Sequence, residues 1–271
     1  MSKFRITTGA LVLAAAMGAI GITLGATAGV ADAAEIKVLA SGALKLALPQ
    51  LLADFEKSSG HAARVEYGPA GAIADRVRKR EAADVAIVTK AQLAGLERDG
   101  KVVRGSAVDI AGTALGVAIR KGAAKPDIGT AEAFRQALLA ARAIGYRDPA
   151  TGSTSGIYTA RMLDQLGVAQ LLKPKIKLDS SEGAHPEDVF QSLVTGEIEL
   201  QIGQISEIVL APGVELLGPL PAEIQDVTML AAAVTTTSQA PEAASALIAF
   251  LSSPATAAIL KANGFLPAAK N

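Results

Sequence analysis

The sequence has 271 residues, with 26 Lys and Arg against 26 Asp and Glu, and it contains no cysteine. A chain without cysteine has no disulfides, no thiol nucleophile and no thiolate metal ligands. Its balanced charge offers no basic excess to neutralise a phosphate backbone, which argues against nucleic acid as a partner. Half of the residues are apolar but only 3% are aromatic, so we expect an aliphatic core like that of α/β proteins with helices on both faces of a sheet.

The N-terminal segment, residues 1–33, is predicted to be an export signal. Lys3 and Arg5 precede an uncharged stretch that runs from residue 9 to residue 30, and Ala31-Asp32-Ala33 places small residues at the two positions that a signal peptidase reads. We expect cleavage after Ala33 or Ala34 and a periplasmic mature protein. An uncleaved anchor is the alternative, because the apolar stretch is long enough to span a bilayer.

The first part of the mature chain alternates β-rich runs with helical patterns. Strands are predicted at 36–39, 64–67 and 83–88, and apolar residues at helical spacing predict helices at 44–60, 73–80 and 92–99. An extended, nearly uncharged run at 107–119 then interrupts the alternation. Such a run predicts a crossover to a second lobe, so we place a hinge there.

The remaining chain repeats the alternation. Helices are predicted at 131–142, 156–166, 186–195, 241–251 and 254–262, and strands at 143–146, 175–178, 199–205, 214–217 and 227–234. The predicted fold is α/β with two lobes and a ligand cleft between them. We assign residues 34–112 to the first lobe, 113–212 to the second, and 213–271 to a return to the first.

Three turns carry glycine or small hydroxyl residues just before a predicted helix. They are Ser41-Gly42-Ala43, Gly68-Pro69-Ala70-Gly71 and Thr151-Gly152-Ser153-Thr154-Ser155-Gly156. Helix N-termini expose unpaired N–H groups and a partial positive charge, so three of them converging on one cleft would bind an anion. The alternative for each turn alone is an ordinary N-cap or β-turn.

Other polar residues give weaker signals. Arg147 follows a predicted strand and is suited to pair with a ligand carboxylate, although a surface ion pair with Asp148 is the alternative. Gln204 ends an apolar strand, where a ligand or water would satisfy its amide. Thr154 stands where a nucleophile-elbow serine would be needed, which argues against a serine hydrolase. Only two histidines and no cysteine are present, so neither a metal site nor a cofactor is expected.

With these elements in order, the chain resembles the molybdate-binding protein family of bacterial ABC transporters, within the type II periplasmic binding proteins. The similarity runs from Ile36 to Asn271. The motifs that carry it are Leu39-Ala40-Ser41-Gly42, Ala82-Ala83-Asp84-Val85-Ala86-Ile87, Asp148-Pro149-Ala150-Thr151-Gly152 with Ser155-Gly156-Ile157-Tyr158, and Gly264-Phe265-Leu266-Pro267. The resemblance implies a monomeric carrier that binds a small anion and delivers it to a membrane permease.

Carried over residue by residue, the resemblance also informs the choice of ligand. Ser41 matches the first serine that holds the oxyanion in that family, whereas the second serine falls in 68–71, where this chain has no hydroxyl. Ser155 matches a position that offers its backbone amide, Val189 lies near another, and Gln204 stands at the tyrosine position. These departures argue against molybdate and favour an organic carboxylate contacted by Gln204, Arg147 and the hydroxyls of the 151–154 turn.

Some relatives of this family are enzymes, of which a periplasmic aconitate isomerase is the known kind. That reaction moves a proton along an allylic system and needs a base within hydrogen-bond reach of the carbon acid. His185, Glu207 and Asp148 are the candidates for this base, and no spacing singles one out. Isomerisation of a small tricarboxylate is therefore the alternative to carriage.

Overall fold

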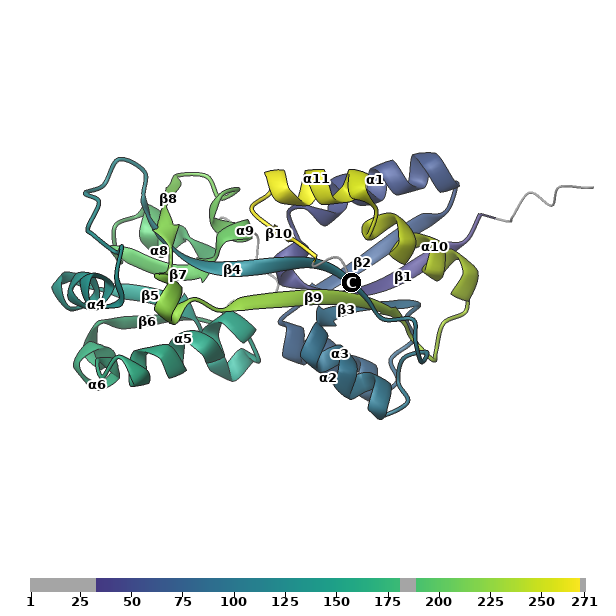
Figure 1. Cartoon of the computed structure of the whole chain (residues 1–271), viewed down its shortest axis with the longest axis horizontal. Coiled ribbons are helices and arrows are strands. Elements are labelled where there is room, and N and C mark those ends of the chain that lie inside the picture. The colour runs from purple at the N-terminus through teal and green to yellow at the C-terminus, as the bar shows by residue number, and fades with distance from the viewer. Residues whose placement is uncertain (1–32, 181–188, 269–271) are drawn as a thin grey trace, which may run out of the picture. The chain divides into compact units, whose positions relative to one another are not determined.

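The computed structural model describes residues 33–180 and 189–268, and from Ala33 onward the chain forms one compact unit. Two α/β lobes make up this unit, and two long strands run through both of them (Figure 1). The predicted α/β fold with two lobes is thereby confirmed. Most of the predicted export signal lies outside the described residues.

The first lobe is built from alternating strands and helices, as the sequence predicts. In chain order these are β1 (Glu35–Ser41), α1 (Leu48–Ser59), β2 (Ala62–Gly68), α2 (Ala70–Arg78), β3 (Val85–Thr89) and α3 (Lys90–Arg98), joined at the end of the chain by α10 (Pro241–Leu251), α11 (Pro254–Ala262) and β10 (Leu266–Pro267). Local chemistry fixes several boundaries. Thr89 and Gln92 form a capping box at the start of α3, and Gly60 ends α1 with a left-handed φ of 75°.

The second lobe repeats this construction. It contains α4 (Ala131–Ala140), β5 (Ile144–Arg147), α5 (Thr154–Gln165), α6 (Ala169–Leu172), β6 (Ile176–Asp179), α8 (Gln191–Val194), β7 (Leu200–Gln204), α9 (Ile205–Ile208) and β8 (Val214–Pro219). Short 3-10 turns precede or follow several of these elements: η1 (Gly42–Leu44), η2 (Pro149–Thr151), η3 (Lys173–Lys175) and η4 (Ala222–Ile224). The predicted strand at 199–205 ends one residue earlier, because Ile205 already begins α9.

One continuous sheet links the lobes in the order β2-β1-β3-β9-β4-β7-β5-β6. The extended run predicted at 107–119 forms β4 (Val108–Arg120), whose first half pairs with β9 (Val227–Val234) and whose second half pairs with β7 and β8. Residues 213–226, assigned above to the return into the first lobe, include β8, which pairs with β4 beside β7. The chain enters the first-lobe part of the sheet with β9, which pairs with β3.

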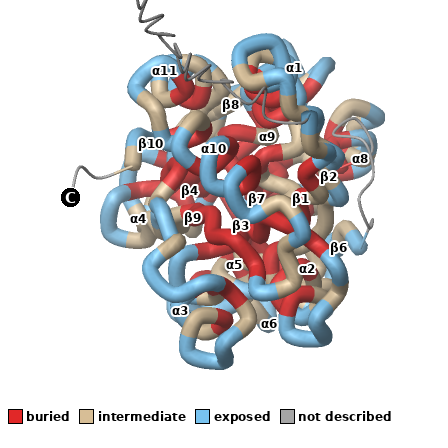
Figure 2. The backbone as a smooth tube through the Cα atoms, turned by 90° about the vertical axis from the view of Figure 1, so that its right-hand side faces the viewer, coloured by how far each residue is buried: buried red, intermediate tan, exposed pale blue. Residues whose placement is uncertain are grey.

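Each lobe buries side chains on both faces of its part of the sheet. In β1, Val38 packs with α1 and α10 on one face, while the next residue, Leu39, packs with α2 and α3 on the other. In the second lobe, Val117 of β4 packs on one face of the sheet, and the next residue, Ala118, packs on the other. Strands covered on both sides read as continuous aliphatic runs, which is why the sequence located them well. The buried segments accordingly lie on the central strands, inside the helices (Figure 2).

Asp84 is a structural joint of the first lobe. Its side chain is 6% exposed and accepts hydrogen bonds from the backbone N–H groups of Lys37, Gln239 and Ala240 and from the Ser238 hydroxyl. Burial by itself raises the pKa of Asp84, but the four hydrogen bonds together outweigh burial and hold that pKa below its usual range. The family motif around Asp84 thus joins β1, β3 and the start of α10.

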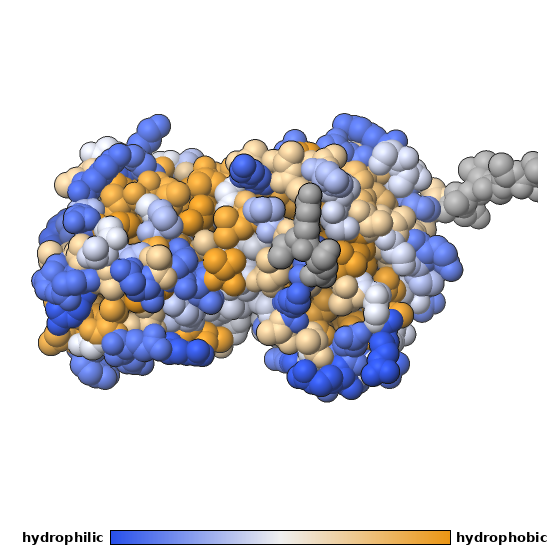
Figure 3. Space-filling model, in the orientation of Figure 1, coloured by the Kyte–Doolittle hydropathy of each residue, from blue (hydrophilic) through white to orange (hydrophobic). Residues whose placement is uncertain are grey.

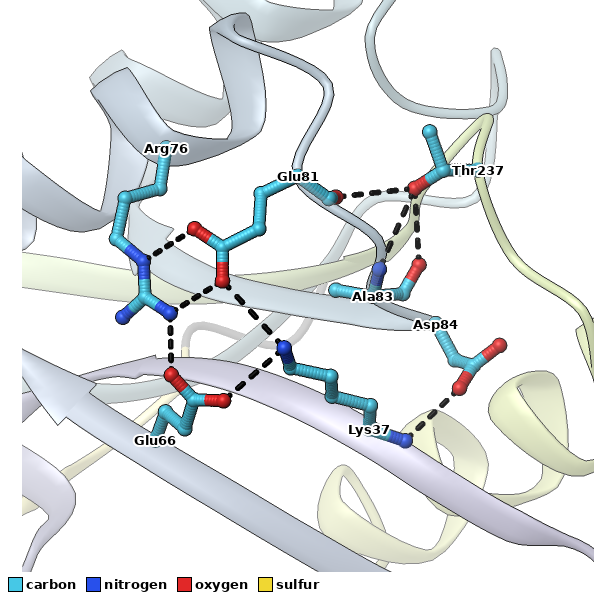
Figure 4. Close-up of polar contacts among 7 residues, drawn as sticks. All are labelled: Lys37, Glu66, Arg76, Glu81, Ala83, Asp84 and Thr237. Atoms are coloured by element: carbon cyan, nitrogen blue, oxygen red, sulfur yellow. Dashed lines mark hydrogen bonds and ion pairs between the residues drawn. The ribbon is translucent and has the colours of Figure 1, made fainter.

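A charged cluster stands next to this joint at the edge of the sheet (Figure 4). Lys37 and Arg76 each contact both Glu66 and Glu81, bringing β1, β2 and α2 together. The hydrogen bonds from Arg76 come first among the causes that lower the pKa of Glu66 and of Glu81, the latter to about 2. These side chains are 29–49% exposed, so the cluster contributes little to stability.

No single helix within 33–180 and 189–268 is long and apolar enough to cross a membrane, although the consecutive helices α10 and α11, bent by 60°, would pass as a pair by length and composition. The residues of α10 that face inward belong to the core of the first lobe. On the face drawn in Figure 3, hydrophilic side chains form the outer margins of both lobes, and apolar side chains gather on the second lobe near β8.

Candidate functional site

A small cavity lies where the two lobes meet. Strand ends, the turns after them and one short helix supply its wall. The lining residues are Gly42, Lys45 and Leu46 after β1, Tyr67 and Gly68 at the end of β2 with Pro69 after it, Arg147 at the end of β5, Val189 and Phe190 before α8, and Glu207 in α9. Its volume is about 30 Å³, which is room for about two water molecules. The lobes are therefore closed in this structure, and a larger ligand enters only when they part.

Two glycines make the contact that closes the lobes. The backbone N–H of Gly71, at the start of α2, donates to the carbonyl of Gly152, before α5, at 3.3 Å. A Cβ atom on Gly71 would stand 3.0 Å from that carbonyl oxygen, which is too close for an ordinary contact. Absence of a side chain at Gly71 therefore allows the two turns predicted to share the cleft to touch.

Arg147 is held in the cavity wall by an acidic neighbour. Its Nη1 lies 2.7 Å from Asp179 Oδ2, and the two side chains are only 16% and 20% exposed. The pairing follows from the sheet, because Arg147 of β5 stands opposite Asp179 of β6 in the parallel register. Among the described residues, Asp179 rather than the neighbouring Asp148 considered from the sequence forms an ion pair with Arg147, and this pair holds the guanidinium in place.

Glu207 places a carboxyl group in the same wall. It lies in α9, the short helix that follows β7. Burial raises the pKa of Glu207, the positive charge of Arg147 opposes that rise, and the negative charge of Asp179 adds to it. Of the two acid–base candidates among the described residues, Glu207 lines the cavity and Asp148 does not.

The other two candidates differ in position. Asp148 caps η2, where its carboxylate accepts from the Ala150 N–H and from the Ser180 hydroxyl, and it is not among the residues that line the cavity. The first of these bonds is the larger cause that lowers the pKa of Asp148. His185 lies outside the described residues.

Two polar lining residues were not identified from the sequence. Lys45 follows η1, and Tyr67 stands near the end of β2. Burial raises the pKa of Tyr67 to about 12, so its phenol stays neutral and can donate a hydrogen bond. The only signal in the sequence was the position of each beside a predicted turn, which does not tell a lining residue from a surface one.

The three predicted turns contribute in different ways. Ser41 is 5% exposed and its Oγ accepts from the Ala43 N–H at 3.4 Å, so it acts as an N-cap. Gly42 and Pro69 line the cavity, and Ala70 is buried at the start of α2. Ser41 therefore caps the turn, while Gly42 and Pro69 are the residues of these two turns that lie in the wall.

The hydroxyls of the third turn are engaged locally. Thr151 donates to the Asp148 carbonyl at 2.8 Å, and the Ser153 and Ser155 hydroxyls lie 3.0 Å apart, with Ser153 also capping α5. Thr154 is half-buried at the first position of α5. None of these four lines the cavity as it stands closed.

Gln204 contacts β4 and does not line the cavity. Its Oε1 accepts from the Thr113 hydroxyl of β4 at 2.5 Å, and Thr113 Oγ1 lies 3.3 Å from the Ser206 hydroxyl. The sequence indicated that this buried amide needed a partner, and Thr113, 91 residues earlier in the chain, could not be identified as one from spacing. Val189 does line the cavity, and its carbonyl accepts from Gln201 Nε2 at 2.9 Å.

A second, larger cavity of about 480 Å³ lies on the second lobe alone. It is lined by the end of β4 at Arg120, the C-terminal part of α4, and residues 196–200 at the start of β7. Ligands of open α/β sheets bind beyond the carboxyl ends of the strands, and this cavity lies at the amino end of β7. The smaller cavity, at the carboxyl ends of β1, β2, β5 and β7, is therefore the candidate site.

Two α/β lobes with a small cavity between them define the class of two-lobed binding proteins. Residues 36–266 match the family model described as bacterial extracellular solute-binding protein. The chain belongs to this family. The resemblance to molybdate-binding proteins drawn from the sequence is confirmed at the level of the family.

Individual relatives point to two different activities. An aconitate isomerase of Pseudomonas sp. is 31% identical over 242 residues, covering 86% of this chain and 87% of the relative. The molybdate-binding protein ModA of Azotobacter vinelandii is 25% identical over 253 residues, covering 91% and 95%. The solved periplasmic molybdate-binding protein of Azotobacter vinelandii superposes with a TM-score of 0.71 at 21% identity, covering 86% of this chain and 99% of that one.

Proposed function

We propose that the cavity between the lobes binds a small organic di- or tricarboxylate, and that the protein carries this anion in the periplasm, as a monomer, to the membrane permease of an ABC importer. The observation that carries the proposal is Arg147. Its guanidinium is held in the wall by Asp179 at 2.7 Å. A planar guanidinium recognises a carboxylate through two parallel hydrogen bonds.

The charges around the cavity support an anionic ligand. Lys45 lines the wall contributed by the first lobe and Arg147 the wall contributed by the second. A carboxylate between them would gain from both, and closure of the lobes would strengthen each interaction by removing water. Tyr67 adds a neutral phenol that can donate to a ligand oxygen.

The residues present are less suited to a tetrahedral oxyanion. The turn at 68–71 has no hydroxyl, and the buried Gln204 amide contacts Thr113. The hydroxyls of Ser153 and Ser155 contact one another. An oxyanion site of the molybdate type relies on such hydroxyls, whereas the polar side chains that line this cavity are those of Arg147, Lys45, Tyr67 and Glu207.

A titration of the purified protein with carboxylates and oxyanions tests this proposal. Calorimetry with trans-aconitate, cis-aconitate, citrate, succinate, molybdate and sulfate should give saturable binding for a carboxylate. Arg147→Ala should weaken that binding by about 1.5–3 kcal/mol, roughly 10- to 150-fold in Kd. Arg142→Ala is the matched control, because Arg142 precedes the same strand but is 79% exposed and paired with Glu199.

Submicromolar molybdate affinity with no carboxylate binding would overturn the proposal. So would an unchanged carboxylate affinity in Arg147→Ala. Because the Arg147 substitution also leaves Asp179 partly buried, Arg147→Lys should be measured beside it. Lys keeps the charge but not the planar pair of donors, so affinity should fall to an intermediate value.

A second candidate function is isomerisation of the bound carboxylate, and a specific observation favours it. Glu207 places a carboxyl group in a cavity otherwise suited to anions. The relative at 31% identity is an aconitate isomerase. Carriage needs no acid–base group, whereas movement of a proton along an allylic system does.

A further inference from the structure

We propose that the larger cavity, on the second lobe alone, is a second ligand site, and that it binds an amphipathic anion, namely a single carboxylate on an unbranched aliphatic chain. The larger cavity shares no lining residue with the cavity between the lobes. The two lie beyond opposite ends of β7, the larger one at Leu200 and the smaller one at Glu207. The second site is therefore separate from the proposed carboxylate site and does not depend on it.

Small side chains keep the larger cavity open. Ala137, Ala140 and Ala141 line it at the C-terminal end of α4, and residues 123–126 add two more alanines and a proline from the chain between β4 and α4. These elements stand at the end of the second lobe that is remote from the first (Figure 1). The volume of about 480 Å³ lies within the range of roughly 300–1,000 Å³ that is usual for small-molecule sites.

The apolar part of the lining suits an aliphatic chain. Ile198 and Leu200, each 3% exposed, form its floor at the start of β7. Among the described residues, no aromatic side chain lines this cavity. A flat ring would therefore find no stacking partner, whereas a flexible chain gains from each methylene group that leaves water.

The charged part of the lining leaves one positive charge unbalanced. Both carboxylate oxygens of Glu199 accept from Arg142, one from its backbone N–H at 2.9 Å and one from its side chain. Lys125 pairs with Glu215, which lies beside the cavity and does not line it. Within 33–180 and 189–268, no acidic side chain forms an ion pair with Arg120. A ligand with one negative charge would complete this balance.

The fold holds the backbone of Arg120 beside the alanines. Arg120 is the last residue of β4, where it stands opposite Val214 of β8. The N–H of Ala123 donates to the Arg120 carbonyl at 2.9 Å, so the chain turns there toward α4. The exposed guanidinium offers a planar pair of donors to a carboxylate whose chain lies in the cavity. Because water weakens a contact with an exposed charge, burial of the chain must supply most of the affinity.

Calorimetric titration of the purified protein with straight-chain monocarboxylates tests the proposal. Decanoate should bind saturably, with one molecule per protein. From hexanoate to decanoate the affinity should rise about two- to fourfold for each added methylene group, because each one buries further apolar surface. Decylammonium has the same chain and the opposite charge, so it should bind about tenfold more weakly than decanoate.

Two substitutions place the ligand in this cavity. Arg120→Glu replaces attraction by repulsion and should weaken decanoate binding about tenfold. Ala140→Phe should weaken it at least about tenfold, because Ala140 is exposed and lines the cavity, so a ring there takes the space of the chain without entering the core. Arg104→Glu and Ala246→Phe are the matched controls. Both sites are exposed and belong to the first lobe, so decanoate affinity should stay within about twofold of wild type.

Three results would overturn the proposal. The first is decanoate that does not bind, or that binds no more tightly than butyrate. The second is equal affinity for decanoate and decylammonium. The third is decanoate binding that Arg147→Ala abolishes and Arg120→Glu leaves unchanged, because the ligand would then lie in the cavity between the lobes. Titration of Arg120→Glu with trans-aconitate should match wild type, which keeps this test apart from that of the proposed function.

Discussion

Gly156 should be irreplaceable because it lets α5 pack against the backbone that presents Arg147. A Cβ atom on Gly156 would lie 2.2 Å from the Arg147 carbonyl oxygen, 3.0 Å from the Arg147 carbonyl carbon and 3.2 Å from the Asp148 carbonyl carbon. All three contacts are with main-chain atoms, so no rotamer change relieves them. Gly156→Ala must therefore displace either α5 or the end of β5.

The size of the effect follows from these distances. Real Cβ contacts below 3.0 Å essentially do not occur, so the helix and strand must separate by about 3.0 − 2.2 = 0.8 Å. Overpacking of this kind costs about 1–3 kcal/mol. Alanine gains up to about 1 kcal/mol over glycine in a helix, and less in the first turn, where Gly156 lies. We expect a net loss of about 1–2 kcal/mol in the free energy of unfolding.

Urea denaturation of Gly156→Ala, with calorimetric titration of the bound carboxylate, measures both consequences. Affinity should fall as well as stability, because the displaced backbone carries Arg147. Gly203→Ala is the matched control, since Gly203 lies in β7 and a Cβ there would meet nothing nearer than Phe190 at 4.0 Å. Equal stability of Gly156→Ala and wild type would show that the Cβ atom fits without displacing α5 or β5.

Three further predictions concern other parts of the chain. The side chain of Asp84→Asn has one acceptor oxygen where the carboxylate has two. The variant should therefore lose about 1.5–3 kcal/mol in the free energy of unfolding, measured by urea denaturation. Because the pKa of Asp84 is lowered in the fold, this loss should vanish as pH falls below about 4. A difference in unfolding free energy between this variant and wild type that stays the same at every pH would contradict the prediction. Gly71→Ala, whose Cβ would meet the Gly152 carbonyl at 3.0 Å, should weaken ligand binding by about 1 kcal/mol, roughly fivefold. Unchanged affinity would show that this contact does not limit closure. Glu207→Gln should stabilise the free protein at pH 8 and leave it unchanged at pH 4. The pKa of Glu207 is raised in the folded protein. Below the unfolded pKa the side chain is neutral in both states, like Gln, whereas its ionisation as pH rises through the folded pKa destabilises the wild type. Thermal melts should be compared at the two pH values. An equal difference in melting temperature between Glu207→Gln and wild type at pH 8 and at pH 4 would contradict the prediction.

The sequence predicted the strands well for a physical reason. Runs such as 36–39 and 83–88 are buried on both faces, so they are continuously aliphatic and end at glycine, serine or threonine. β8 carried no comparable signal. Its residues are half-buried, and nothing in Val214–Leu217 tells which part of a sheet it will join.

The site was only partly accessible to sequence reasoning. Arg147 was named because it follows a predicted strand, where the carboxyl ends of the sheet gather functional groups. Glu207 was named only as one of three candidate bases, and the sequence did not single it out. Lys45 and Tyr67 were missed, since their place in the wall depends on how two lobes close. Gln204 was matched to a ligand position by resemblance, whereas its amide contacts Thr113, which lies on a strand far away in the sequence.

We propose that the cavity between the lobes selects a carboxylate through Arg147. Calorimetric titration of wild type and Arg147→Ala with trans-aconitate and with molybdate, under one set of conditions, tests it most directly. Wild type should bind trans-aconitate saturably, Arg147→Ala should bind it about 10- to 150-fold more weakly, and neither should bind molybdate tightly. Submicromolar molybdate binding that survives Arg147→Ala, with no heat from trans-aconitate, would contradict it.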